Sequence, residues 1–216
     1  GSGGGGGIII RANTGGSPLC KGVYFRVQTS NALRFLVGGS TDMVLDTSIN
    51  SITLGIWQHV LVTWDGSTTA TNAHIYVNGI ETSYGSSTNL VTATDNSGAS
   101  AYIGARATAS VDCPSIRFFD GVINELAVWN VVLAAPEIAL LASSRVKGIP
   151  LQIQSSAQKL YVPMDDQESG TSADGDTVRD LSGNGNNGTG DNGANNTGLS
   201  WVGEQVLSYT SGIIGQ

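Results

Sequence analysis

The sequence predicts an all-β fold, a two-sheet antiparallel β-sandwich with one short helix near residues 136–145. Three observations favour this fold class. Short apolar blocks recur at close spacing along the 216 residues, which is typical of a fold built from many short strands. Thirty glycines, with many asparagines, serines and threonines, separate these blocks and favour turns. Only one segment has the apolar spacing of a helix, and a chain of this length fits a single β-sandwich.

The first strands can be justified in chain order. Residues 23–28 and 32–37 alternate or run apolar and are separated by a short polar turn. Residues 57–64 follow. Residues 74–77 end in Asn78-Gly79, the strongest short hairpin signal, because a type I′ turn needs positive φ at both central positions. The 57–64 strand places three apolar side chains on one face, Val60, Val62 and Trp64.

The rest of the chain adds one helix and further strands. Residues 121–129 are apolar on both faces, as expected of a central strand. Pro136 fits the first turn of a helix, and a weak apolar stripe follows it. This stripe consists of Ile138, Leu140 and Leu141. The remaining predicted strands are residues 101–103, 159–163 and 201–209.

Composition excludes several functional classes. The net charge is −7 with ten lysines and arginines, and no basic cluster occurs, so we expect no nucleic-acid binding. No apolar run approaches the roughly 20 residues that a membrane span needs, so we expect no membrane insertion. Charged residues make up 12%, about half the usual share, which favours an extracellular or particle-exposed protein. Cys20 and Cys113 either form one bridge or are two unrelated thiols.

Residues 165–200 differ from the rest of the chain because they are rich in glycine, asparagine, aspartate, serine and threonine. A plain linker is one interpretation. A loop that holds a ligand is the other, because these side chains supply oxygen donors.

Several segments carry a family resemblance. Residues 57–66 read WQHVLVTWDG, residues 74–81 read HIYVNGIE, residues 119–130 read FDGVINELAVWN, and residues 180–189 read DLSGNGNNGT. Together they resemble the laminin-G-like jelly-roll domains of the concanavalin A-like lectin and glucanase superfamily. The resemblance extends over roughly residues 8–145 and 158–203. It implies a concanavalin A-like jelly roll.

The loop at residues 180–188 is a candidate calcium site. Its aspartate and asparagine side chains supply hard oxygen ligands, which suit calcium better than zinc. In proteins that this segment resembles, such a loop helps to hold a structural calcium ion near the strand matching Asn124-Glu125. The candidate ligands are Asp180, Asn184, Asn186 and Glu125. A tight asparagine–glycine turn without a metal is the alternative.

Glu125 is a candidate in its own right, because it alternates with apolar residues in the predicted strand and a carboxylate on an apolar face is costly unless it is paired. A calcium ion is one partner that would satisfy it, and a hydrogen-bonded structural role is the other interpretation. The family usually has Asp-Glu where this chain has Asn124-Glu125, and the loss of one carboxylate weakens a metal site.

No catalytic constellation is evident. The superfamily's glucanases carry acidic residues at alternate positions of one strand, and this pattern does not occur here. Asp165 and Asp166 are adjacent, so in a strand they would point to opposite faces. His59 and His74 lie in strand patterns that favour packing. Core packing rather than stacking on a sugar ring is likewise favoured for Trp57, Trp64, Trp129 and Trp201, whereas both interpretations stay open for Tyr84 and Tyr102.

The order of the segments bears on assembly. In the family, the segment matching residues 180–189 normally comes first and the one matching residues 119–130 comes last. We therefore interpret residues 1–150 as the main part of the sandwich and residues 151–216 as a segment that resembles the first strands of the same fold. This segment either completes the same sandwich or adds a strand to a neighbouring copy. Residues 204–216 are then a candidate docking arm.

These observations favour a non-catalytic structural or adhesive module, displayed on a virion, filament or cell surface, that associates with copies of itself or other subunits. A calcium-assisted carbohydrate-binding module is the alternative, with a glycan as its partner. A glycoside hydrolase, the third candidate, is disfavoured because the acidic strand is missing.

Overall fold

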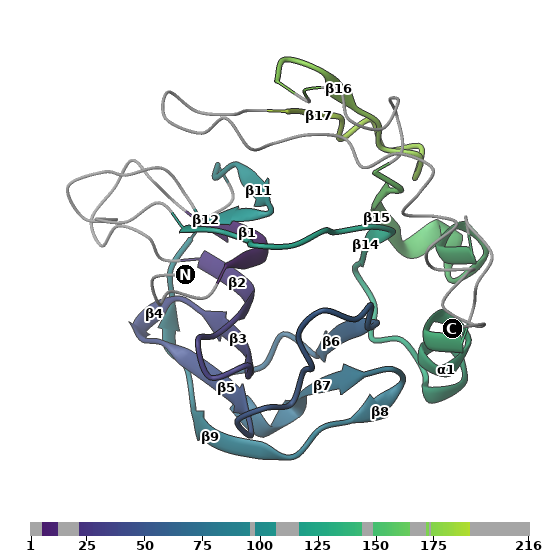
Figure 1. Cartoon of the computed structure of the whole chain (residues 1–216). Coiled ribbons are helices and arrows are strands. Elements are labelled where there is room, and N and C mark those ends of the chain that lie inside the picture. The colour runs from purple at the N-terminus through teal and green to yellow at the C-terminus, as the bar shows by residue number, and fades with distance from the viewer. Residues whose placement is uncertain are drawn as a thin grey trace. The chain divides into compact units, whose positions relative to one another are not determined.

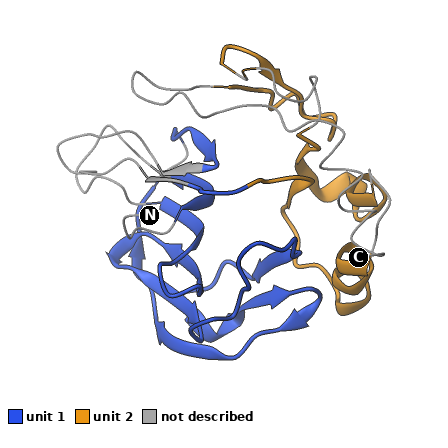
Figure 2. Ribbon diagram, in the orientation of Figure 1, with its two compact units in different colours: residues 1–121 blue, residues 122–216 orange. Residues whose placement is uncertain are grey.

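The structure is a computed structural model that describes residues 6–12, 22–95, 98–106, 117–143, 149–164, 172 and 174–190. Contacts within the chain divide it into two compact units, residues 1–121 and residues 122–216 (Figure 2). The predicted division after residue 150 stays a prediction. Several sequence predictions lie outside the described residues, namely those on Cys20, Cys113, Asp165, Asp166, the strand at 201–209 and the arm at 204–216.

The larger sheet of unit 1 has six antiparallel strands in the order β11-β1-β2-β3-β5-β9 (Figure 1). Its two central strands are those predicted from residues 23–28 and 32–37. Phe25 lies opposite Phe35, and Phe35 lies opposite Leu45, so these apolar side chains share one face. The strands are β1 (Gly7–Ala12), β2 (Gly22–Val27), β3 (Leu33–Val37), β5 (Met43–Thr47), β9 (Tyr84–Thr88) and β11 (Ala101–Ile103).

The second sheet of unit 1 has three antiparallel strands in the order β6-β7-β8. These are β6 (Val60–Trp64), β7 (Ala73–Val77) and β8 (Ile80–Glu81). The turn between β7 and β8 has φ of 51° at Asn78 and 80° at Gly79. Both values are positive, as a type I′ turn requires, so the predicted hairpin is confirmed.

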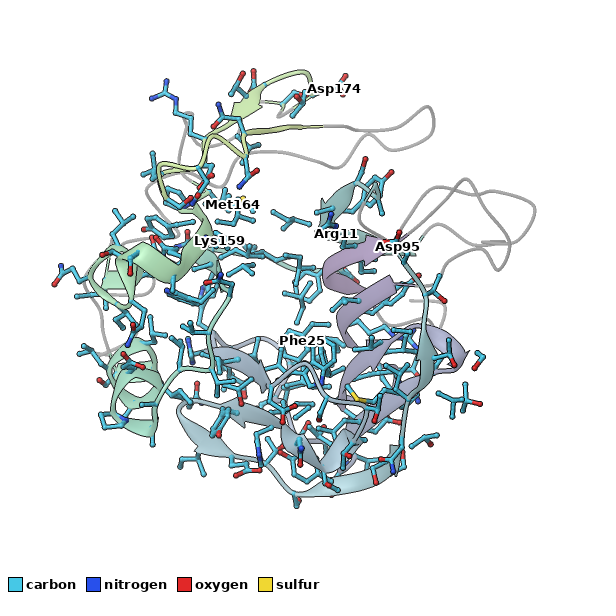
Figure 3. The ribbon with its side chains drawn as sticks, turned by 180° about the vertical axis from the view of Figure 1, so that it is seen from behind. Arg11, Phe25, Asp95, Lys159, Met164 and Asp174 are labelled. Carbon is cyan, nitrogen blue, oxygen red and sulfur yellow. The ribbon has the colours of Figure 1, made fainter. Side chains whose placement is uncertain are left out.

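The two sheets pack face to face around one apolar core. Phe25, Phe35 and Leu45 from the larger sheet and Ile75 from the smaller sheet are at most 5% exposed. Figure 3 shows Phe25 among the packed side chains of unit 1. The predicted β-sandwich is therefore confirmed. So is the predicted inward face of β6, because its apolar residues pack against this core as partly buried side chains, namely Val60, Val62 and Trp64.

Smaller pairings complete unit 1. In one of them, β4 approaches β10 so closely at Gly39 that an added Cβ would lie 2.6 Å from Leu90 Cδ1 and 2.7 Å from the Val91 carbonyl oxygen. Only glycine fits there without a shift of the backbone. The remaining elements are β4 (Gly39–Thr41), β10 (Val91–Ala93), β12 (Ala105–Arg106), β13 (Arg117–Phe118) and the 3-10 helix η1 (Ala70–Asn72).

The described residues of unit 2 form one α-helix, two 3-10 helices and two short pairs of strands. Its strands β14 (Leu126–Trp129) and β15 (Gln158–Val162) are antiparallel, with Ala127 opposite Tyr161. Strand β15, from the predicted C-terminal segment, thus pairs within this chain. No helix among the described residues is long and apolar enough to cross a membrane. The other elements are α1 (Ala135–Ser143), η2 (Ile149–Gln152), η3 (Ser155–Ala157), β16 (Thr177–Val178) and β17 (Gly188–Thr189).

The structure corrects three details of the prediction. The strand expected at residues 121–129 contains only the four residues of β14, because the backbone bends at Glu125, where φ is 54°. The helix is present, but Leu140 on its predicted apolar stripe is 49% exposed, whereas Ile138 is buried. The strand expected at residues 57–64 begins at Val60.

Candidate functional site

The candidate site in unit 2 is a loop at residues 180–187 that lies against β15. Asp180 fixes this loop, because its carboxylate accepts hydrogen bonds from three backbone N–H groups. Its Oδ1 atom accepts from Tyr161 at 3.0 Å and from Ser182 at 2.9 Å, and its Oδ2 atom accepts from Asn186 at 2.9 Å. The carboxylate thus ties both ends of the loop to the strand.

The electrostatics of Asp180 follow from this arrangement. Its side chain is buried, and burial by itself would raise the pKa. The hydrogen bonds from Ser182, Tyr161 and Asn186 outweigh burial and hold the pKa of Asp180 below its ordinary value of 3.8. Hydrogen bonds to a carboxylate favour its charged form, so Asp180 is ionised at neutral pH.

The asparagines of the loop also bind the backbone. Asn184 donates from Nδ2 to the Gln158 carbonyl oxygen at 2.8 Å, and Asn186 donates from Nδ2 to the Lys159 carbonyl oxygen at 2.8 Å. These two residues therefore satisfy two carbonyl acceptors of β15. Two turns within the loop have positive φ, at Gly183 (84°) and Gly185 (74°), a conformation that glycine adopts without steric cost.

Glu125 lies just before β14 rather than within a strand. Its Oε2 atom accepts a hydrogen bond from the Tyr161 hydroxyl at 2.7 Å. Tyr161 is only 1% exposed, and a buried tyrosine hydroxyl usually has such a partner. The carboxylate therefore has a hydrogen-bond partner within the protein, as one of the two interpretations of Glu125 expected.

Each of the four predicted calcium ligands makes a hydrogen bond within this chain, and their role in calcium binding stays a prediction. Asp180 binds the backbone N–H of Tyr161, whereas Glu125 binds the hydroxyl at the far end of the same side chain. The length of a tyrosine side chain therefore separates these two contacts. The described residues contain no group of three or more His, Cys, Asp or Glu side chains placed to hold a metal ion. In this arrangement the Asp180 carboxylate is already engaged by three backbone N–H groups.

Asn124 carries two buried polar side-chain atoms that this network does not satisfy. Its Oδ1 and Nδ2 atoms are buried and have no hydrogen-bond partner among the described residues. Burying an amide without a partner costs roughly 1–3 kcal/mol. Asn124, next to Glu125, thus has polar atoms to offer a ligand.

Sequence reasoning missed the residue at the centre of this arrangement, Tyr161. It lies within a short apolar strand pattern, which predicts burial and no further role. The useful signal was that a buried tyrosine hydroxyl needs a hydrogen-bond partner and that the Glu125 carboxylate needs one as well. Each group is the partner of the other. Gln158 was missed for the same reason. It is 2% exposed and donates to the Pro150 carbonyl oxygen at 2.9 Å.

The two histidines have different environments. Burial lowers the pKa of His59 to about 4, so His59 is neutral at pH 7, in keeping with a packing role. His74 instead contacts Glu81 Oε1 through Nδ1 at 2.8 Å, and the Tyr84 hydroxyl donates to the same oxygen at 2.7 Å. The hydrogen bond with His74 lowers the pKa of Glu81. Tyr84 also accepts from the Ile75 N–H at 3.0 Å, so this cluster ties β9 to β7 and β8.

Trp64 and Trp129 have structural roles. Trp64 packs against Phe35 with ring centroids 5.8 Å apart and donates from Nε1 to the Ser67 carbonyl oxygen at 2.9 Å. Trp129 donates from Nε1 to the Ile153 carbonyl oxygen at 2.8 Å. Both residues are half-buried, and both indole N–H groups are used within this chain.

Comparison with known proteins identifies the family. A family model described as the concanavalin A-like lectin/glucanases superfamily matches residues 1–139. No curated protein matches the chain. Among solved structures, the chain is similar to an S-layer domain-containing protein (residues 221–444) from Clostridium thermocellum ATCC 27405, with 22% identity, a TM-score of 0.32 and coverage of 59% of each chain. Because the family model covers more than half of the sequence, this chain belongs to the concanavalin A-like lectin/glucanase superfamily.

Proposed function

We propose that this chain is a non-catalytic β-sandwich module with a structural or adhesive role in an extracellular surface assembly, where it associates with copies of itself or with other subunits. One observation carries the proposal. Unit 1 exposes large aliphatic side chains on the loop between β5 and β6 and on the neighbouring hairpin. These are Ile49 (71% exposed), Leu54 (68%), Ile56 (58%) and Ile80 (75%).

The loop that carries three of these residues is firmly braced. The Asn50 N–H donates to the Ser30 carbonyl oxygen at 2.9 Å, which ties the loop to the turn between β2 and β3. Across the loop tip, Gln58 accepts from the Thr53 N–H at 3.2 Å and donates to the Thr53 carbonyl oxygen at 3.0 Å. A braced loop loses little conformational entropy on binding, so its exposed side chains are well suited to contact a partner.

The hairpin that carries Ile80 is tied to the same loop. The Asn78 N–H donates to the His59 carbonyl oxygen at 2.8 Å, and Asn78 Oδ1 accepts from the His59 N–H at 2.9 Å. Both segments thus belong to one region of unit 1. Exposed large aliphatic side chains grouped on one region of a soluble domain favour an interaction surface.

A structural role also suits Asp180 and Glu125, whose described hydrogen bonds are made to this chain's own groups.

Removal of this apolar surface should weaken assembly. We expect the full chain to form species larger than a monomer without added glycan. The double variant Leu54→Ser, Ile56→Ser should dissociate at about 100-fold higher concentration, since each lost aliphatic contact is worth about one factor of ten. Sedimentation velocity over a wide concentration range measures this.

The matched control is Leu140→Ser, which removes an aliphatic side chain of 49% exposure from α1 and should leave the mass distribution unchanged. A full chain that stays monomeric at every concentration would contradict self-association. Equal assembly by the Leu54→Ser, Ile56→Ser variant and the native chain would show that this surface is not responsible.

Calcium-assisted carbohydrate binding is the second candidate, and the buried amide of Asn124 favours it. A cation next to Glu125 would provide a partner for the amide oxygen of Asn124, which has none among the described residues. Calcium accepts amide and carboxylate oxygens. The candidate predicts retention on a polysaccharide column, release by a chelator, and heat on titration of calcium that disappears in Asn124→Leu. No heat on titration and no retention would rule it out.

A further inference from the structure

We infer that the open edge of β6 pairs with the same edge of a second copy, so that a two-fold axis at Val62 joins two three-stranded sheets into one six-stranded sheet. This inference rests on the proposed self-association and names the strand that carries it. It differs from the apolar loop surface, because it depends on backbone groups.

The hydrogen bonds of β7 establish which backbone groups of β6 point outward. The His59 carbonyl oxygen accepts from Asn78 N–H on the β7 side. The Ile75 carbonyl oxygen and N–H bond to Thr82 and Tyr84 on the opposite side of β7. Groups on an antiparallel strand alternate between its two sides. Leu61 and Thr63 therefore bond to β7, and the N–H and C=O groups of Val60, Val62 and Trp64 point away from it.

The outward groups of Val60, Val62 and Trp64 have no backbone partner among the described residues, since β6 pairs there only with β7. The residues of β6 themselves also lack the usual protective features of an edge strand. Edge strands are commonly guarded by charges, proline or bulges, whereas β6 reads Val-Leu-Val-Thr-Trp. The opposite edge of the same sheet, β8, has two residues, one of them Glu81. Edge strand β9 has a bulge at its pairing with β5.

The outward groups are symmetric about Val62. In an antiparallel pair centred on a two-fold axis there, Val62 faces Val62 of the second copy. Val60 of each copy faces Trp64 of the other. Each of these is a hydrogen-bonded pair that exchanges two N–H···O bonds, which gives about six bonds in all. No outward group between Val60 and Trp64 is left over, and such self-complementarity is what an isologous dimer interface needs.

The side chains are compatible with this axis. A charge near a two-fold axis meets its own copy, and the net charge of −7 makes such encounters unfavourable in general. The five residues of β6 carry no charge. The next residue, Asp65, would lie opposite His59 of the second copy rather than opposite another carboxylate. On the face away from the core, Leu61 would lie beside Thr63 of the second copy. A second copy is therefore a fitting occupant of this edge.

The test is Val62→Pro in the full chain, with Val62→Thr as the matched control. Proline removes the N–H at the axis and places its ring there, yet the β7 ladder does not use that N–H. We expect the dimer dissociation constant to rise about 10- to 100-fold, because two central hydrogen bonds are lost. Threonine keeps the N–H and the β-branched shape, so its constant should stay within a few-fold of native. Circular dichroism checks that both variants fold.

A second variant and a direct readout guard against misfolding. Leu61→Lys places a charge beside the axis and should also favour the monomer, whereas Thr88→Lys on β9 should not. Amide hydrogen exchange at Val60, Val62 and Trp64 should slow as concentration rises. The spectrum of a spin label attached at position 61 should broaden by dipolar coupling. With the axis at Val62, the two copies of position 61 are diagonal neighbours, which lie ~7–8 Å apart.

The outcomes separate this inference from the proposed function. An assembly that survives both Val62→Pro and Leu61→Lys, with no concentration-dependent protection of β6, overturns the β6 pairing and leaves self-association intact. Protection of β6 with no dipolar broadening at Leu61 overturns the symmetric pairing, because a different strand then occupies the edge. A full chain without any assembly refutes the self-association on which both rest.

Discussion

Replacement of Asp46 by alanine is expected to destabilise unit 1 by about 3 kcal/mol, because it strands a charge in a partly buried network. Arg34 and Asp46 form a bidentate pair across β3 and β5, with both N···O distances 2.6 Å. Their side chains are 25% and 13% exposed. Gln28 and Ser86 donate to the same carboxylate at 2.9 and 3.0 Å. The hydrogen bond to Asp46 raises the pKa of Arg34 despite its burial. The variant lacks this bond, but a guanidinium group stays protonated in proteins, so Arg34 keeps its charge and loses its partner.

Urea unfolding followed by tryptophan fluorescence measures this effect. The double variant Arg34→Met, Asp46→Leu is the informative control, since it removes both charges and keeps apolar volume. It should regain most of the lost stability, because two apolar residues of similar size often replace an ion pair at little cost. A loss below about 1 kcal/mol for Asp46→Ala would mean that solvent already satisfies Arg34, as in an exposed pair.

Replacement of Asp180 by alanine should cost unit 2 about 3 kcal/mol, since three N–H groups lose a charged acceptor. One of these N–H groups belongs to Tyr161, a buried residue. The hydrogen bond from Tyr161 N–H to Asp180 is also buried. The amides of Tyr161, Ser182 and Asn186 should then exchange hydrogen faster, and denaturant unfolding should show the lost stability. Asn184→Ala, which removes the bond to the Gln158 carbonyl oxygen, is the graded control at about 1 kcal/mol.

The Asp180 effect has a defined pH dependence. Its folded pKa lies below its ordinary value of 3.8, so the unfolded chain binds the proton first as pH falls. The stabilisation is therefore fully present above about pH 5 and is lost as pH drops through 3.8 and the lower folded pKa. Asp180→Ala should lose less stability than the native chain over this acidic range. If a chelator at neutral pH destabilised the native chain as much as Asp180→Ala does, a metal rather than the hydrogen bonds would hold the loop.

Much of the fold was predictable because its signals are local. The Asn78-Gly79 turn fixes its hairpin through two positive φ values, which the sequence pattern specifies directly. The neighbouring strands around Phe25 and Phe35 follow from alternation and a short turn. The bend at Glu125 was not predictable, since a glutamate with positive φ is held there by contacts outside its own segment.

The candidate site shows the same division. The sequence by itself determined that residues 180–187 form a turn-rich loop of oxygen-bearing side chains, and that Glu125 needs a partner. Only the tertiary structure decided what those groups bind, because the partners come from distant positions. Asp180 and Tyr161 are 19 residues apart, and Tyr161 and Glu125 are 36 residues apart. Periodicity and turn chemistry act over a few residues, whereas the choice between a cation and a backbone N–H depends on which strand folds against the loop.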